Sequence, residues 1–400
     1  MKITFLILSI LILISIASAT LSPNSARDDK KKNKKNKDDA KNEKKKPEVS
    51  EKDVFQRQLV RRDVTATDIL READILSKHT NIRHYVPGEV LGYITPWNGA
   101  GYDRAKKFHK KFDLVSPVWF VIQGGHPFKI PVHDMDKKWL KSMQDANTKK
   151  HSVKILPRIL FDRWTSDQVE EIFHDLQKRH RFIDMLISLA ETNSFDGYVL
   201  EIWNQFLMAG VRKSILTALI TSIADGLREN DLDTILAIPA QRKMENELFT
   251  KEDFEELSPH IRYFSVMTYD FSSVHRPGPN APVDWIRDCI KALVPKTNDV
   301  RRAQILMGLN FYGYHYTPSG GGPIVGSQYL ELLEKHKGKL QWDDESEEHF
   351  FEVKAKDNPG YVFFPTLYSL MSRLELAVEM KVGIAIWELG QGLNYFMDIL

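Results

Sequence analysis

Short apolar runs recur along the chain from about residue 90 onward, separated by longer stretches in which apolar and polar positions alternate with a helical period. Near-continuous apolar runs of this length, rich in β-branched and aromatic residues, are typical of strands that are covered on both faces. The eight runs are residues 90–97, 114–122, 153–161, 195–203, 234–239, 263–271, 305–313 and 383–389.

The stretches between these runs carry the spacing of amphipathic helices. The clearest predicted helices are residues 166–191, 211–230, 251–257, 283–293 and 367–380. Eight buried strands that mostly alternate with helices over about 300 residues predict a parallel (β/α)8 TIM barrel, an α/β fold. We place this domain at residues 86–400.

The gap before the last apolar run is too long for a single helix. It contains two short runs with strand character, residues 340–342 and 350–353. We therefore expect a small α+β insertion at about residues 314–381, between the seventh and eighth strands of the barrel.

The residues before the barrel fall into three zones. Residues 1–19 fit a secretory signal peptide, because Lys2 precedes an apolar run and an Ala-Ser-Ala cleavage site ends at residue 19. Residues 20–54 predict a disordered Lys-rich segment, and residues 55–85 a helical extension with Thr67 as a plausible cap. We expect a secreted or lysosomal protein, and no membrane span, since no later apolar run approaches 18 residues.

Charge and cysteine content exclude several classes of function. Lys2 contributes +1 and residues 27–46 contribute +6, so the other residues carry −5 of the total of +2. A mildly acidic domain argues against nucleic acid as a partner. Cys289 is the only cysteine, and the sequence has no Cys/His spacing for zinc, no P-loop and no dinucleotide fingerprint. We therefore expect no metal and no cofactor.

Polar and aromatic residues gather where the predicted strands end. In a TIM barrel the carboxyl ends of the strands form the functional face, and aromatic rings beside a few carboxylates suit the apolar faces and polar rims of a sugar. The candidate ligand-binding residues are Trp97, Trp119, Glu201, Trp203, Met267, Tyr269, Asp270, Asn310, Tyr312, Trp387 and Glu388, and Arg158 lies on the third run without an assigned role. A structural role for each of them, in packing or in a hydrogen bond between Glu201 and Asp270, is the alternative.

Four motifs along these strands resemble glycoside hydrolase family 18. Residues 195–197 (FDG), 267–271 (MTYDF), 308–313 (GLNFYG) and 385–387 (AIW) resemble its fourth, sixth, seventh and eighth strands in that order. Residues 91–98, 201–205, 275–282 and 387–392 are similar to a chitinase-like branch of the family. The resemblance covers about residues 86–400 and implies a barrel that binds N-acetylated sugars, with Tyr269, Met267 and Trp387 around the acetamide group.

The same resemblance raises a doubt about catalysis. Family 18 chitinases carry D-x-x-D-x-D-x-E on the fourth strand, and the last Glu protonates the glycosidic oxygen while the acetamide of the substrate attacks. Asp196 matches the first acid, but Val199 and Glu201 stand at the second and third, and Trp203 stands at the last. An indole cannot act as a general acid at neutral pH.

We therefore expect a chitinase-like lectin that binds oligosaccharides, chitooligosaccharides or other N-acetylated microbial glycans, in the barrel mouth. Two alternatives stay open. One is a weak or altered glycosidase that uses Glu201 or Asp270. The other is a protein-interaction scaffold with a filled cleft and a protein partner in the secretory or endo-lysosomal pathway.

Overall fold

The structure is a computed structural model, and it describes residues 48–85, 88–124, 130–242, 248–354 and 359–400. The predicted signal peptide and residues 20–47 of the predicted Lys-rich segment lie outside the described residues. Of the helices formed by the described residues, none combines the length and the apolarity needed to cross a lipid bilayer.

Ten parallel strands form the central sheet, and they close it into a ring. Their order is β5-β7-β8-β9-β10-β11-β17-β3-β4-β6. The strands are β3 (Val90–Ile94), β4 (Leu114–Pro117), β5 (Phe120–Gln123), β6 (Lys154–Ile155), β7 (Arg158–Asp162), β8 (Gly197–Glu201), β9 (Asp233–Pro239), β10 (Tyr263–Met267), β11 (Ile305–Asn310) and β17 (Gly383–Trp387).

The two ends of that order are halves of two broken strands. β4 and β5 follow each other along the chain and together make the second strand of the barrel, while β6 and β7 make the third. β4 pairs with β6, and β5 pairs with β7, so the second and third strands are neighbours and the ring is complete. The expected (β/α)8 barrel is confirmed.

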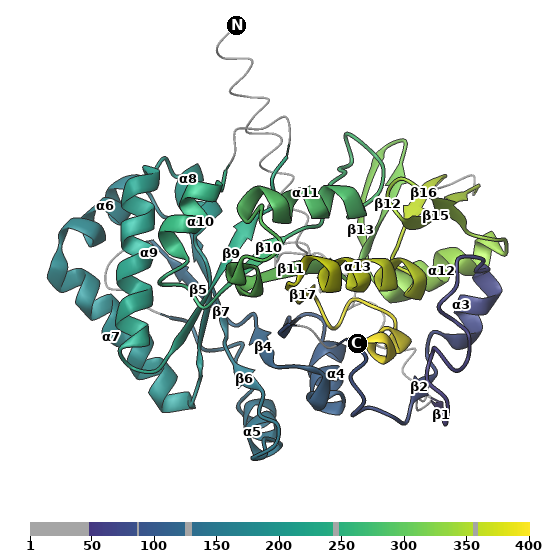
Figure 1. Cartoon of the computed structure of the whole chain (residues 1–400), viewed down its shortest axis with the longest axis horizontal. Coiled ribbons are helices and arrows are strands. Elements are labelled where there is room, and N and C mark those ends of the chain that lie inside the picture. The colour runs from purple at the N-terminus through teal and green to yellow at the C-terminus, as the bar shows by residue number, and fades with distance from the viewer. Residues whose placement is uncertain (1–47, 86–87, 125–129, 243–247, 355–358) are drawn as a thin grey trace, which may run out of the picture.

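Helices surround this ring (Figure 1). They are α4 (Ala100–Lys107), α5 (Lys137–Asp145), α6 (Ser166–His174), α7 (Leu176–Asn193), α8 (Trp203–Met208), α9 (Lys213–Arg228), α10 (Lys251–Leu257), α11 (Val283–Leu293) and α13 (Leu367–Met380), with the 3₁₀ turns η1 (His109–Lys111), η2 (Val300–Gln304) and η3 (Asn394–Ile399). The predicted bounds of α10, α11 and α13 are confirmed. The predicted helix 166–191 is two helices, because the Asp175 side chain ends α6 and caps α7.

The insertion is a five-stranded antiparallel sheet with one helix. Its order is β13-β12-β16-β15-β14, with α12 (Gly326–His336) against β15. The strands are β12 (Gly313–Thr317), β13 (Gly320–Ile324), β14 (Gln341–Asp343), β15 (Glu348–Val353) and β16 (Gly360–Phe363). The predicted range ran too far, because α13 packs against α11 and β11 as a helix of the barrel.

The segment before the barrel is less helical than predicted. Only α3 (Ala66–Glu72) is a helix, and Thr65 rather than Thr67 caps it. β1 (Val49–Ser50) and β2 (Leu76–Ser77) form a small parallel sheet, and Val54 is fully buried. Residues 48–54 are therefore ordered rather than part of a disordered segment, because β1 pairs with β2 and Val54 packs into the core, although Val49 stays exposed.

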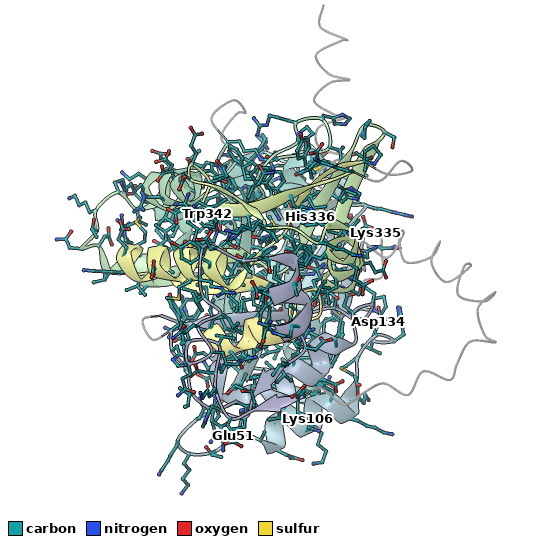
Figure 2. All side chains as sticks on the ribbon, turned by 90° about the vertical axis from the view of Figure 1, so that its right-hand side faces the viewer. Glu51, Lys106, Asp134, Lys335, His336 and Trp342 are labelled. Atoms are coloured by element: carbon teal, nitrogen blue, oxygen red, sulfur yellow. The ribbon has the colours of Figure 1, made fainter. Side chains whose placement is uncertain are left out.

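This N-terminal segment lies against the insertion and against the end of the chain. α3 contacts α12, and β2 contacts η3, so the segment runs beside the right-hand part of the molecule in Figure 1. Figure 2 looks onto this side, with Trp342 and His336 of the insertion above Glu51 of the segment.

Candidate functional site

Five side chains from five barrel strands meet inside the barrel, below the carboxyl ends of β8 and β17, and we call them the floor cluster: Tyr93, Arg158, Glu201, Ser265 and Trp387. The Tyr93 hydroxyl donates a hydrogen bond to the Ser265 hydroxyl oxygen at 2.9 Å, across the interior of the barrel. The rings of Tyr93 and Trp387 lie 5.2 Å apart. The cluster joins strands β3, β7, β8, β10 and β17 at one point.

An ion pair dominates this cluster. Arg158 Nη1 donates to Glu201 Oε2 at 2.5 Å, and the two side chains are 8% and 18% exposed. The same guanidinium lies over the Trp387 ring, 5.7 Å from its centre. Arg158 therefore engages both the Glu201 carboxylate and one face of the Trp387 ring.

Tyr269 lies next to the floor cluster and is buried. Burial raises the pKa of its hydroxyl well above the usual value, and the neighbouring Tyr93, Asp270 and Glu201 raise it further. Burial raises the pKa of Tyr93 as well. Both hydroxyls therefore stay protonated over the physiological range and can donate hydrogen bonds.

Asp270 belongs to a separate network. Its Oδ1 accepts hydrogen bonds from the hydroxyls of Tyr312 and Tyr314, the latter at 2.9 Å. Its backbone N–H donates to Asn280 Oδ1 at 2.6 Å, and its φ of +61° is held by these contacts. Burial raises the pKa of its carboxyl, and the two hydroxyl donors lower it in part. The alternative of a hydrogen bond between Glu201 and Asp270 is not found among the described contacts, because Glu201 binds Arg158 and Asp270 binds Tyr312 and Tyr314.

Glu388 lies directly after β17, and its carboxyl binds the loop that follows this strand. It is fully buried, its Oε1 accepts from Asn98 Nδ2 at 2.9 Å, and its Oε2 accepts from the Gly390 N–H at 2.8 Å. Burial raises its pKa to about 7, although the Gly390 N–H and the positive charge of Arg104 oppose that shift. Its contacts bind backbone and side chains of the protein, so the structure gives Glu388 a structural role.

The other candidates are distributed between the mouth and the core. Met267 and Trp97 are partly exposed at the mouth. Trp119 is 2% exposed and donates from Nε1 to the Tyr102 hydroxyl at 2.7 Å, which places it against the helices rather than in the mouth. Asn310 Nδ2 donates to the carbonyl of the buried Tyr312 at 2.8 Å.

Two partners in these networks were not foreseen as site residues. Arg158 stood at a predicted strand end without a role, yet an arginine inside an otherwise apolar run was a usable signal. Tyr314 lies in the insertion, and nothing in the sequence connects it with Asp270. Within the described parts of the chain, no group of three or more His, Cys, Asp or Glu residues is arranged to hold a metal ion.

The sequence matches the family model described as Glycosyl hydrolases family 18 over residues 89–392. The chain belongs to this family. Solved structures similar to it include a class V chitininase from Pseudomonas fluorescens Pf-5, with a TM-score of 0.64 and 18% identity over 78% of this chain and 98% of that one.

Two further solved structures come from other lineages. The spore cortex-lytic enzyme SleL of Bacillus megaterium has a TM-score of 0.62 and 19% identity, over 78% of this chain and 72% of the other. A family 18 chitinase from Cycas revoluta in complex with (GlcNAc)3 has a TM-score of 0.60 and 16% identity, over 78% and 97%. At these identities the likeness concerns the fold.

Trp203, which stands at the position of the family 18 acid, does not lie on the strand. β8 ends at Glu201, and Trp203 is the first residue of α8, so the predicted continuation of the strand to Trp203 is wrong. The indole is fully buried, donates from Nε1 to the Leu248 carbonyl at 2.9 Å, and lies 4.8 Å from the ring of Phe249. This burial leaves no Trp203 surface for a ligand.

Asp196, which matches the first acid of the family 18 motif, lies at the other end of β8. Its Oδ2 accepts from the Ile155 N–H at 2.7 Å, and burial raises the pKa of its carboxyl. Asp196 therefore ties the third and fourth barrel strands together and does not reach the mouth.

Proposed function

We propose that this family 18 protein is a chitinase-like lectin, which binds oligosaccharides with N-acetylated sugars at the barrel mouth and does not hydrolyse them. The family 18 fold supports carbohydrate binding or hydrolysis in general. The observation that favours binding over hydrolysis concerns Glu201, whose carboxyl lies two residues before Trp203, the position aligned with the catalytic acid. Glu201 is engaged by the Arg158 guanidinium, and Trp203 offers no proton in its place.

The mouth retains side chains of the kind that bind sugars. Trp97 and Phe271 are partly exposed aromatic residues at the ends of two strands, and Met267 is partly exposed between them and the floor cluster. Gln205 Oε1 is buried without a hydrogen-bond partner in the described structure. Aromatic faces beside unsatisfied polar atoms support an uncharged, hydroxyl-rich ligand.

Within family 18 we place the chain beside chitinase domain-containing protein 1. The support is the similarity of residues 91–98, 201–205, 275–282 and 387–392 to that protein. The signal-like residues 1–19 support a secreted or lysosomal location and a role in innate immunity through microbial glycans.

One observation favours a second candidate, the scaffold with a filled cleft. Trp387 is only 5% exposed, and Arg158 covers one face of its ring. A ligand that needs this face must displace the guanidinium from both Trp387 and Glu201. A protein partner that does not contact the floor cluster can bind without displacing this guanidinium.

Intrinsic tryptophan fluorescence during titration with chitooligosaccharides of increasing length distinguishes the two candidates. We expect a saturable change that strengthens with length, weakens in Trp97→Ala and is retained in the matched variant Trp342→Ala, whose indole packs against His349 in the insertion. No response of the wild type to any oligosaccharide at millimolar concentration excludes the lectin and favours the scaffold.

Hydrolysis is tested separately by long incubation of labelled chitooligosaccharides with the wild type and with Glu201→Gln. We expect the same background cleavage in both. Cleavage by the wild type that disappears in Glu201→Gln establishes a glycosidase instead. Asp270 is a weaker candidate for that activity, because both of its hydroxyl donors would have to leave before it could act on a sugar.

A further inference from the structure

A cavity of about 490 Å³ opens at the end of the barrel opposite to the mouth, and we call it the foot cavity. Its lining comes from the amino-terminal ends of β9 and β10, the last turns of α9 and the loop that joins α10 to β10. The volume lies within the range of small-molecule sites. The polar residues that matter here are Glu89, Arg228, Thr234, His260, Arg262 and Tyr263.

Neutral hydrogen-bonding groups line the inner part of this cavity. Thr234 is 3% exposed, and its Oγ1 has no hydrogen-bond partner in the described structure. The Tyr263 hydroxyl donates to Glu89 Oε1 at 3.1 Å. Burial raises the pKa of Glu89, and the neighbouring Asp113 carboxylate raises it further. Glu89 is therefore biased toward its uncharged form, which reduces its repulsion of an anion.

The remaining acidic groups at the cavity already have cationic partners. Asp225 accepts hydrogen bonds from Arg228 Nη2 at 2.7 Å and from His260 Nδ1 at 2.8 Å. Asp233 pairs with Lys154 Nζ at 2.6 Å. These contacts neutralise the carboxylates nearest to the opening.

Arg262 is the exception among these charges. Its guanidinium lies 5.1 Å from the centre of the Tyr263 ring, and in the described parts of the chain no carboxylate oxygen lies within 4.0 Å of it. Among the described residues it thus has no carboxylate partner, and it lies next to an aromatic ring and an unpartnered buried hydroxyl. A guanidinium in this state is suited to bind a carboxylate through paired N–H donors.

We propose that the foot cavity binds a small organic monocarboxylate. Arg262 forms the ion pair with the carboxylate, and the unpartnered Thr234 hydroxyl donates a hydrogen bond to the ligand, while the Tyr263 hydroxyl keeps its hydrogen bond to Glu89. The apolar body of the ligand lies on Ala224, Leu232 and Ile261, which also line the cavity. A phosphate monoester fits less well, because among the described residues that line the cavity no second arginine or lysine without a carboxylate partner is present to meet its second charge.

The test uses the full chain and 4-fluorobenzoate, whose binding is followed by ¹⁹F NMR. We expect saturable binding by the wild type and weaker binding of the neutral analogue 4-fluorobenzamide. Arg262→Gln should lose at least about tenfold in affinity, the usual effect of losing a charge-assisted hydrogen bond. Arg181→Gln, which removes another exposed arginine from α7, should bind like the wild type.

Thr234→Val supplies a second variant, since it removes the unpartnered hydroxyl but keeps the shape of the side chain. It should weaken binding less than Arg262→Gln does. Three results overturn the proposal: no saturable binding of 4-fluorobenzoate, equal affinity in the wild type and Arg262→Gln, or tighter binding of inorganic phosphate than of 4-fluorobenzoate. None of these measurements depends on oligosaccharide binding at the mouth.

Discussion

The two ends of the barrel use the same residue types in opposite ways. At the mouth, Arg158 lies on an aromatic ring and its charge is met by Glu201. At the foot, Arg262 lies on an aromatic ring and no carboxylate of the described structure meets its charge. The difference shows that an arginine on an aromatic ring can be paired or unpaired, and that only the position of the nearest carboxylate distinguishes the two cases.

The largest expected effect concerns Trp203, the residue that the sequence resemblance aligns with the family 18 acid. Trp203→Ala removes a fully buried indole and should lower the free energy of unfolding by about 3–5 kcal/mol, as is typical of large-to-small changes in a core. Denaturant unfolding measures this loss. Trp97→Ala is the control, because Trp97 is partly exposed and should lose less. An equal loss in both would show that Trp203 is not a core residue.

The next effect concerns Glu388, a carboxyl at the mouth whose pKa is raised. Its pKa of about 7 lies above the value of 4.5 for an unfolded chain, so the folded state holds the proton more tightly. The resulting stability is complete below pH 4.5 and is lost as the pH rises toward 7, by ~3 kcal/mol for a shift of this size.

Glu388→Gln has no such proton, so its free energy of unfolding relative to the wild type should rise over that pH range. Urea unfolding of both proteins at a series of pH values measures the difference. A pH-independent difference would contradict the burial of Glu388 as the cause of the shift.

A direct comparison of the two arginines follows. Arg158→Ala leaves the Glu201 carboxylate without its guanidinium in a site that is 18% exposed, and should lower the free energy of unfolding by about 2 kcal/mol. Arg262→Ala leaves no carboxylate without a partner and should change it by less than about 0.5 kcal/mol. The double variant Arg158→Ala with Glu201→Gln should recover part of the loss. Equal losses of unfolding free energy in Arg158→Ala and Arg262→Ala would show that the two arginines do not differ in how their charges are paired.

The smallest effect is expected at Glu89 in the foot cavity. Glu89→Gln removes a carboxyl that repels Asp113 but retains an acceptor for Tyr263, so near neutral pH it should stabilise the protein by about 0.5 kcal/mol. Because the pKa of Glu89 is raised in the folded state, this gain should shrink as the pH falls. Thermal unfolding of both proteins at two pH values measures this stabilisation. A stabilisation that grows as the pH falls would contradict the raised pKa of Glu89.

Sequence patterns predicted the barrel well because burial and helix periodicity are local signals. The bounds of α10, α11 and α13 followed from amphipathic spacing alone. Strand ends were predicted too long at Trp97 and Trp203, since their apolar character reflects packing beyond the last paired residue rather than strand pairing. Apolar content shows that a side chain is buried but not by which element.

The partners within the site could not be predicted in the same way. The contact of Arg158 with Glu201 depends on the register of β7 against β8, in which Leu160 faces Glu201. The hydrogen bond from Tyr314 to Asp270 joins the insertion to the barrel over 44 residues of sequence. Residue types indicated that polar groups gather at the mouth, but only three-dimensional contacts show which of them are already paired.

The two broken strands have a consequence for how the barrel opens. β4 and β6 share only two register pairs, Leu114 with Lys154 and Val115 with Ile155, whereas β9 and β10 share five. The other half of the same seam, β5 with β7, has four pairs, so only the β4–β6 half is short of ladder bonds, and its backbone amides should exchange with deuterium before those of β9 and β10. Arg158 is the first residue of β7 beyond the break, so we expect that opening of β4 from β6 also loosens the backbone that carries its guanidinium.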